Sequence, residues 1–202
     1  MSDAPVPVAA ALPASLRFVE RDWLSSNQVV GFEGDEAIVV DTGYAKHAAL
    51  TVELVRRVLA ARASETDGKL RLVGIVNTHL HSDHCGGNRA LAHAFDCPIT
   101  VPAASAADVA AWDEVALTHA TTGQRCERFG HAATLAPGDT LRLGGFDWRV
   151  LAAPGHDPKS LIFHCEREGL LVSADALWEQ GFGVIFPELD GQSGFDEQRS
   201  VL

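Results

Sequence analysis

The sequence predicts an α/β fold with two sheets, and two features of the chain indicate it. In the first half, short apolar segments typical of strands alternate with segments of helical character, an order that favours a sheet layer over a helical bundle or an all-β sandwich. After residue 137, four further strand-like segments follow one another with only short turns between them. This second run predicts a second sheet that faces the first.

The first layer is expected to contain five strands and two helices. The strands are expected over residues 16–20, 28–32, 37–40, 70–76 and 98–101. A long helix over residues 46–61, followed by a polar loop at 64–69, carries a Glu53–Arg57 pair spaced for contact on one face. Its apolar stripe is predicted to consist of Leu50, Leu54, Val58 and Ala61, with Val55 and Leu59 beside them.

The remaining elements are assigned on weaker patterns. A short helix is expected near residues 88–95 and another over 103–117, followed by an irregular polar segment at 118–130. The strands of the second layer are expected over residues 140–143, 147–152, 160–166 and 170–173. Residues 1–15 are rich in Ala and Pro, so we expect a flexible N-terminal arm followed by one domain over 16–202.

Composition restricts the class of partner. The formal charge of −11 argues against nucleic acid, and a small-molecule substrate is the expected partner. The four cysteines lack C-x-x-C spacing, which favours reduced thiols in a cytoplasmic protein. Prolines near the N-terminus interrupt any signal-peptide pattern, and no apolar run is long enough for a membrane span, so no membrane association is expected. The oligomeric state is left open.

The segment from Asn77 to Gly87 contains the strongest functional pattern. It follows a predicted buried strand and reads His79-x-His81-x-Asp83-His84, a density of imidazole and carboxylate groups that indicates metal coordination rather than packing. In an extended segment, His79 and His81 point to the same side and can converge on one cation. Asp83 and His84 are suited to a second cation nearby. Gly86 and Gly87 are expected to let the backbone turn sharply before the next helix.

Three more candidate residues follow predicted strands. His156 ends the sequence Pro154-Gly155-His156, and Asp175 follows the strand over 170–173. They offer a third imidazole and a carboxylate able to bridge two cations. Asp41, after the strand over 37–40, could be a ligand, but its position before a glycine favours a structural role in which it accepts hydrogen bonds in the turn.

With these residues in this order, the chain resembles the metallo-β-lactamase fold superfamily over residues 16–202. The resemblance implies an αβ/βα sandwich of two facing mixed sheets with helices outside. It also implies that two metal ions, zinc with iron or manganese as alternatives, are bound by six side chains. His79, His81 and His156 would hold the first ion, Asp83 and His84 the second, and Asp175 would bridge them. The glyoxalase II-like and lactonase-like branches are not distinguished.

The sequence departs from the superfamily pattern near its end. That pattern includes a further histidine on the second metal beyond the bridging aspartate, whereas the last histidine of this chain is His164. A helix is expected to start near Phe195, a few residues before the chain ends. We therefore expect a domain whose C-terminal part is missing and whose second metal site is the weaker one.

The ligand set predicts a metal-dependent hydrolase that attacks a carbonyl, and the resemblance implies a small thioester, a lactone or a related ester or amide as its substrate. By the same resemblance, Asp83 orients the attacking water and passes its proton to the leaving group. Two alternatives stay open. One is an oxidoreductase similar to persulfide dioxygenases, with one iron held by His79, His156 and Asp175. The other is a non-catalytic fragment.

Several other residues have simpler interpretations. Cys85 is expected to be a packed thiol, His47 to be solvated, and His119 and His131 to be ordinary surface histidines. The apolar segment after Asp175 is consistent either with core packing or with the wall of a substrate pocket. Its members are Trp178, Phe182, Val184, Ile185 and Phe186.

Overall fold

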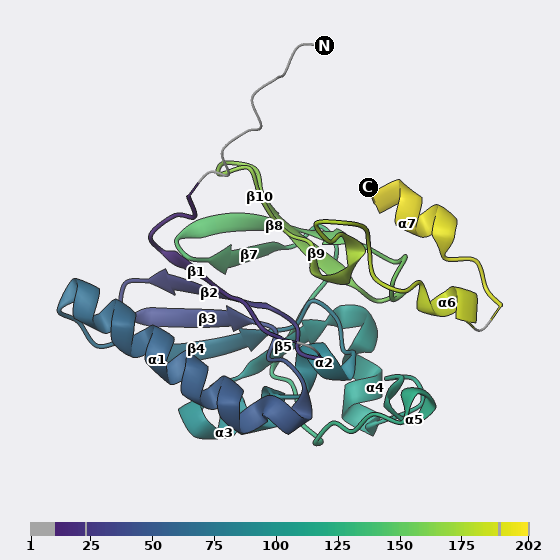
Figure 1. Cartoon of the computed structure of the whole chain (residues 1–202), viewed down its shortest axis with the longest axis horizontal. Helices are drawn as coiled ribbons and strands as arrows, with labels where there is room; N and C mark the ends of the chain where they lie inside the picture. Colours follow the sequence, from purple (N-terminus) through teal and green to yellow (C-terminus); the bar gives the residue numbers. More distant parts are fainter. Residues whose placement is uncertain (1–10, 23, 190, 202) are drawn as a thin grey trace, which may run out of the picture.

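The computed structural model describes residues 11–22, 24–189 and 191–201, and in it two sheets pack face to face (Figure 1). The first sheet has the strand order β1-β2-β3-β4-β5-β6. Its strands are β1 (Leu16–Val19), β2 (Gln28–Glu33), β3 (Glu36–Val40), β4 (Arg71–Val76), β5 (Ile99–Pro102) and β6 (Ala133–Leu135). The second sheet, in the order β10-β9-β8-β7, contains β7 (Thr140–Leu143), β8 (Phe146–Ala152), β9 (Leu161–Cys165) and β10 (Leu170–Val172).

The first sheet is mixed and the second is antiparallel throughout. Strands β1, β2 and β3 pair antiparallel, whereas β3, β4, β5 and β6 run parallel to one another. The register between β3 and β4 shifts by one residue, since Ala37 lies opposite Leu72 but Ile38 lies opposite Gly74. This bulge puts both Leu72 and Ile75 on the helix-facing side of the sheet, although they are an odd number of residues apart.

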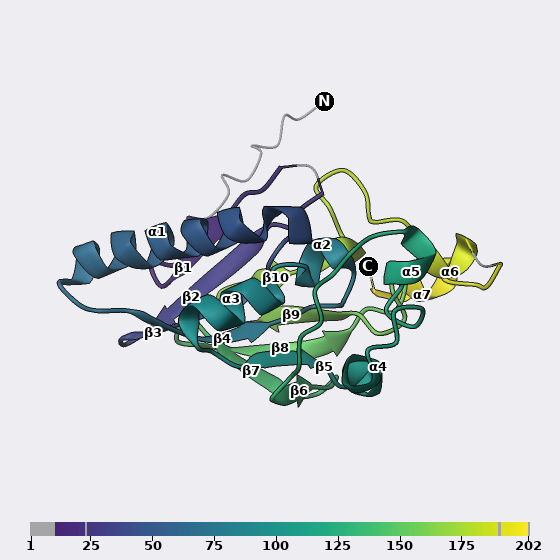
Figure 2. The same cartoon turned by 90° about the horizontal axis from the view of Figure 1, so that it is seen from below.

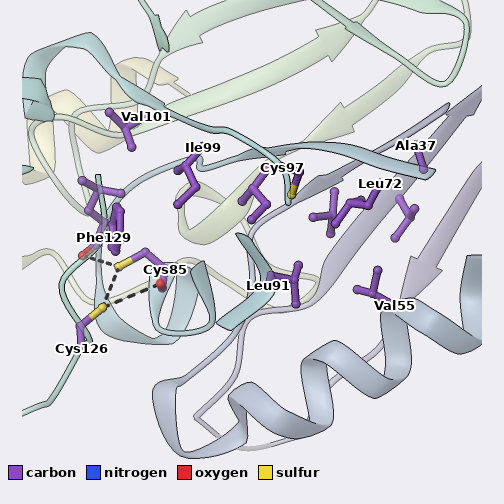
Figure 3. Packing of buried hydrophobic residues seen from close by; sticks show 14 of the residues in the cluster. Ala37, Val55, Leu72, Cys85, Leu91, Cys97, Ile99, Val101, Cys126 and Phe129 are labelled. Atoms are coloured by element: carbon purple, nitrogen blue, oxygen red, sulfur yellow. Dashed lines mark hydrogen bonds between the residues drawn. The ribbon is translucent and has the colours of Figure 1, made fainter. Parts of the chain in front are cut away.

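Two helices cover the outer face of the first sheet. Helix α1 (Ala48–Thr66) and helix α3 (Asn88–Phe95) lie side by side across the strands (Figure 2). Val55 of α1 and Leu91 of α3 are fully buried against strand residues such as Leu72 and Ile99 (Figure 3). This apolar contact holds the helices on the sheet.

A second core lies between the two sheets. Val40 and Val76 from the first sheet meet Trp148, Val150 and Phe163 from the second. Trp148 is fully buried and its indole N–H donates to the Leu143 carbonyl oxygen at 3.0 Å, so the largest side chain of this core leaves no polar atom unpaired. The predicted arrangement of two facing sheets is therefore confirmed.

The long helix differs from its prediction in length and in buried face. It continues into the expected loop to Thr66. The buried residues are Thr51, Val55 and Leu59, so Val55 and Leu59 are confirmed as apolar contacts, whereas Leu50 of the predicted stripe is 52% exposed. Thr51 was not part of the predicted apolar set. Its hydroxyl donates to the Thr42 carbonyl at 3.0 Å, so this polar side chain is satisfied within the interior.

The segment after β5 also differs from its prediction. Only a 3-10 turn (Ala103–Ser105) and α4 (Ala106–Ala111) are helical, and α4 ends where Trp112 takes a left-handed conformation with φ of 55°. A one-turn helix, α5 (His119–Thr122), lies within the segment expected to be irregular, and the short edge strand β6 follows after it, where no strand was predicted. The Glu53–Arg57 ion pair and the bounds of α3 are confirmed.

The last described elements are α6 (Phe186–Leu189) and α7 (Phe195–Val201). Val201 packs against Leu151 and Ile162, whose side chains point away from the inter-sheet core, so α7 covers part of the outer face of the second sheet. Most of the expected N-terminal arm, residues 1–10, lies outside the described residues, while the Ser15 hydroxyl donates to the Gly144 carbonyl oxygen at 2.6 Å. Among the described helices, none has the length and apolar composition needed to cross a membrane.

Candidate metal centre

The topology brings the candidate ligands together at one edge of the sandwich. Because β3 and β4 are parallel, the turn after β3 and the histidine segment after β4 leave the sheet side by side, and the Asp41 N–H donates to the Val76 carbonyl at 2.9 Å. The second sheet joins them where the Leu161 N–H, at the start of β9, donates to the Thr78 carbonyl at 2.9 Å. Strands of both sheets therefore end beside the histidine segment.

His79, His81 and His156 converge as the sequence predicted. Their nearest ring nitrogens all lie within 4.8 Å of one another, and all three side chains are buried. His81 Nδ1 is 3.1 Å from His79 Nε2 and 2.8 Å from His156 Nε2. Three nitrogens bound to one zinc ion in tetrahedral geometry lie ~3.3 Å apart, which is close to this spacing.

Hydrogen bonds on the outer side of each ring determine where its proton lies. The Thr78 hydroxyl donates to Asp41 and so accepts from His79 Nδ1 at 3.1 Å. His156 Nδ1 donates to the Val184 carbonyl oxygen at 2.5 Å. His81 Nε2 faces the buried Asp157 carboxylate at 3.4 Å. Each of the three rings therefore turns an unprotonated nitrogen toward the other two.

His84 forms a second group with His79 and Asp175. Its Nδ1 donates to Asp41 Oδ2 at 2.8 Å, which leaves Nε2, pointing into the site, as the atom that would bind a cation. Asp175 Oδ2 lies 3.4 Å from His84 Nε2 and 3.3 Å from His156 Nε2, a position between the two groups that suits a bridging ligand. Asp83 Oδ2 is 3.7 Å from His84 Nε2 and lies at the more exposed side of the site.

Burial and neighbouring charge set the protonation of these residues. Burial, together with His84 and His81, lowers the pKa of His79 well below its usual value, and burial with His156 lowers the pKa of His81 to about 3. For His84 burial acts in the same direction, but the Asp41 and Asp175 carboxylates outweigh it and raise the pKa. For Asp175 burial alone would raise the pKa, and His84 and His156 reverse this to a net lowering.

This donor set fits divalent cations. Several buried nitrogen lone pairs face one another across about 3 Å, an arrangement that is repulsive unless a positive charge lies between them. Among the described residues, His84 Nε2, which points into the site, is buried without a hydrogen-bond partner. The groups present are the imidazoles and carboxylates that zinc, iron and manganese accept.

A family model described as the metallo-beta-lactamase superfamily matches residues 21–198. The chain belongs to this superfamily. The match includes the histidine segment, His156 and Asp175, so the side chains brought together here fall within the region that the family shares.

Similar proteins agree with this assignment. Hydroxyacylglutathione hydrolase of Cereibacter sphaeroides is 30% identical over 149 residues, covering 74% of this chain and 50% of that protein. The protein of the same name from Bdellovibrio bacteriovorus is 30% identical over 118 residues, covering 58% of this chain and 39% of its own length. The chain thus spans about half or less of the curated relatives it matches.

Solved structures show the same fold. The BLEG-1 B3 metallo-beta-lactamase superposes with a TM-score of 0.63 at 23% identity, covering 84% of this chain and 76% of that one. The FEZ-1 metallo-beta-lactamase of Legionella gormanii gives a TM-score of 0.64 at 13% identity, covering 93% and 72%. The αβ/βα sandwich implied by the resemblance is therefore the fold of this superfamily member.

The two glycines after the histidine segment have a different role from the one predicted. Gly86 and Gly87 have ordinary φ values of −62° and −88°, so neither is required for a sharp turn. Instead a Cβ on Gly86 would lie 2.3 Å from the Ala45 nitrogen, and one on Gly87 would lie 2.5 Å from the Thr42 carbonyl oxygen. The glycines allow α2 (Ser82–Cys85), which carries Asp83 and His84, to pack against the turn after β3.

The aromatic segment after Asp175 lies over the centre. Trp178 is 51% exposed and Val184 55%, so core packing is wrong for both. They line a cavity of about 440 Å³ together with Asp83, His84 and Phe186. The Phe186 ring packs on the His81 ring, with centroids 4.4 Å apart. This segment therefore forms a wall of the site.

A larger hollow adjoins the same side chains. It has a volume of about 680 Å³ and shares Asp175 and Trp178 with the cavity over the metal centre. Apolar residues supply much of its wall, among them Leu16, Phe18, Val40, Trp148, Leu171 and Leu177. An apolar surface therefore adjoins the candidate metal centre.

Other histidines differ from their predictions. His119 is not a surface residue but 1% exposed, because the segment around α5 folds over the histidine segment and His119 Nε2 contacts the Leu80 carbonyl oxygen at 3.1 Å. His47 is half-buried, and its Nδ1 lies 2.7 Å from the Ser25 hydroxyl. His131 is also half-buried and lines a separate hollow. Cys85 is a buried thiol, as predicted.

The sequence interpretation missed three residues that hold the ligands. Thr78 and Asp157 contact His79 and His81 respectively, and the indole N–H of Trp178 donates to Asp175 Oδ1 at 3.2 Å. Thr78 precedes His79 and Asp157 follows His156 in the sequence, and this adjacency to candidate ligands is the signal that could have identified them. Asp41 has the predicted structural role in its turn and in addition orients His84.

Replacing Trp178 by Phe is expected to weaken the centre that contains Asp175. The substitution keeps an aromatic side chain in the wall of the site but removes the hydrogen bond from the indole to Asp175 Oδ1, which holds Asp175 Oδ2 toward both groups of ligands. Loss of a hydrogen bond that supports a metal ligand typically reduces metal affinity ~10–100-fold. Zinc titration of the metal-free protein measures the effect. Phe182→Leu, an exposed change on the same loop, is the control, and equal affinities in the two variants would contradict the role of the indole.

Proposed function

We propose that this chain is a metal-dependent hydrolase that cleaves a small thioester, lactone or related ester or amide. The observation that carries the proposal is the convergence of His79, His81 and His156 beside the His84–Asp175 pair. His81, His156, His84 and Asp175 line one accessible cavity, and His79 lies buried behind them. A purely structural metal centre would not need a cavity that gives a substrate access to it.

Each of these residues would have a separate role in binding metal or in the reaction. His79, His81 and His156 would hold one cation, His84 with Asp83 a second, and Asp175 would bridge them. Cations bound there supply a water of lowered pKa and polarise the carbonyl under attack. Asp83, half-exposed at the cavity wall, orients the attacking water and carries its proton to the leaving group. Phe186 and Trp178 form an aromatic part of the cavity wall beside these groups.

The relatives support a thioester over the other carbonyl substrates. The matching curated proteins are named hydroxyacylglutathione hydrolases, and the apolar hollow beside Asp175 can accept an acyl or alkyl group. The solved lactamases are under 25% identical and bear only on the fold.

The proposal is tested by assaying the zinc-, iron- and manganese-loaded chain on a hydroxyacylglutathione thioester, an acyl-homoserine-type lactone and a β-lactam. We expect thioester hydrolysis that disappears on chelation and returns when metal is added. Absence of turnover on all three substrates by a metal-loaded, folded sample would contradict the proposal. Persulfide oxidation by a sample with one iron per chain would instead support the oxidoreductase alternative.

The centre that contains His84 is expected to bind zinc more weakly than the three-histidine centre. The three-histidine centre has three imidazoles within 4.8 Å of one another, whereas the other centre has His84, Asp175 and the more distant Asp83. A missing ligand should cost at least the ~10–100-fold typical of lost supporting contacts. Calorimetric zinc titration should resolve a tight and a weak event, the tight one lost in His156→Ala and the weak one in His84→Ala. Equal affinities would contradict this assignment.

A further inference from the structure

A second cluster of metal-binding side chains lies behind the histidine segment. Cys85, His119 and Cys126 each offer a ligand atom within 4.8 Å of the others, and all three are buried. They come from three separate parts of the chain: α2, α5 and the loop before β6. None of them belongs to the candidate hydrolytic centre.

The distances within this cluster fit a tetrahedral soft-metal site. Cys85 Sγ is 3.8 Å from Cys126 Sγ and 4.0 Å from His119 Nε2. In a tetrahedral zinc site with Zn–S bonds of about 2.3 Å, two sulfurs lie about 3.8 Å apart and a sulfur and an imidazole nitrogen about 3.6 Å. Figure 3 shows the sulfurs of Cys85 and Cys126 directed toward each other, below Phe129.

A backbone oxygen adjoins the cluster. The Leu80 carbonyl oxygen lies 3.4 Å from Cys85 Sγ and 3.1 Å from His119 Nε2. Leu80 itself is the residue between His79 and His81, so the cluster touches the backbone of the candidate metal centre from behind. A cation held here would fix the loop that carries those ligands.

We propose that Cys85, Cys126 and His119 form a buried binding site for a thiophilic divalent cation such as zinc or cadmium, separate from the hydrolytic centre. Two thiolates balance the charge of one divalent cation, so the occupied site is neutral and suits an apolar interior. Hard cations such as magnesium prefer oxygen ligands and are excluded.

Binding of the cation releases two protons. The two thiols lose their protons to solvent as two metal–sulfur bonds form. His119, whose Nε2 donates to the Leu80 carbonyl in the structure, binds through Nε2 as the other neutral tautomer, with its proton on Nδ1. No oxidant or reductant takes part.

A disulfide between Cys85 and Cys126 explains the cluster less well. A disulfide bond is about 2.05 Å long, so the sulfurs would have to approach by nearly half their present separation. It would also not account for the approach of His119 Nε2 to within 4.0 Å of Cys85 Sγ. A metal ion uses all three side chains at their present spacing.

Cobalt(II) is the probe that distinguishes this site from the hydrolytic centre. Thiolate ligands give cobalt an intense charge-transfer absorption in the near ultraviolet, which a centre made of imidazoles and carboxylates lacks. The reduced, metal-free chain is titrated with cobalt under anaerobic conditions. We expect the thiolate band in the native chain and in His79→Ala, because His79 belongs to the other centre.

Cys126→Ser should lose the band, whereas Cys97→Ser should keep it. Cys97 is a buried thiol in the same hydrophobic cluster but outside the metal-binding group, so it controls for the loss of a thiol. Cys126→Ala serves as the second variant if the serine variant does not fold. Absence of the band at cobalt saturation, or its survival in the folded Cys126 variant, would overturn the proposal whether or not the chain hydrolyses thioesters.

Discussion

Replacing His79 by Ala should reduce metal-dependent turnover by more than about 100-fold, because a ligand contact matters at least as much as the supporting contacts whose loss costs ~10–100-fold in affinity or activity. His79 Nε2 faces His81 directly, and the ring also contacts His84 with centroids 4.0 Å apart, so both groups of ligands lose a neighbour. The measurement is kcat/KM on the hydrolysed substrate at saturating metal.

The fold should survive this change. The sheets and helices are held by the two apolar cores, one built around Val55 and Leu91 and the other around Trp148 and Phe163, and His79 lies at the edge of both. His93→Ala removes an exposed histidine of α3 and is the matched control for turnover and melting. If chelation of the native chain collapsed its melting transition, metal rather than packing would hold the domain together, and the two effects could not be separated.

The sequence predicted the elements that local patterning determines. The strands formed by Val and Ile runs match to within a residue or two at either end, and α3 matches at both ends, since Gly87 before it and the left-handed Asp96 after it bound it locally. The spacing of His79 and His81 predicted their convergence because the chain is extended at His81, whereas the helical turn that carries His84 was not predicted.

The failures have a common physical cause in contacts between distant segments. The buried face of α1 was predicted only in part, because Thr51, a polar residue outside the predicted apolar set, is buried and donates a hydrogen bond to the turn after β3. His119 was assigned to the surface because nothing in residues 118–130 shows that they fold over Leu80. The cluster with Cys85 and Cys126 was missed for the same reason, since its members share no sequence spacing.

Asp41 illustrates a residue whose structural role was predicted but whose full importance needed the structure. It is 3% exposed and accepts hydrogen bonds from the Thr78 N–H at 2.9 Å, the Thr78 hydroxyl at 2.7 Å and His84 Nδ1 at 2.8 Å. One carboxylate thereby fixes the backbone before His79 and the orientation of His84. It also has a φ of 59°, a left-handed conformation that Asp and Asn tolerate better than other residues with a side chain.

Asp41→Ala is therefore expected to lower the free energy of unfolding by roughly 3–5 kcal/mol, because it leaves buried donors without an acceptor and places Ala at a left-handed position. Asp41→Asn keeps the shape and the tolerated backbone but lacks the charge, so it should lose less stability while still weakening zinc binding at His84. Urea denaturation of the metal-free chain measures the first effect and zinc titration the second. Asp35→Ala, at an exposed turn with only a 4.0 Å ion pair to Arg71, is the control and should change stability by about 0.5 kcal/mol or less. An Asp41→Ala variant as stable as this control would show that the hydrogen bonds of the carboxylate do not hold the two loops together.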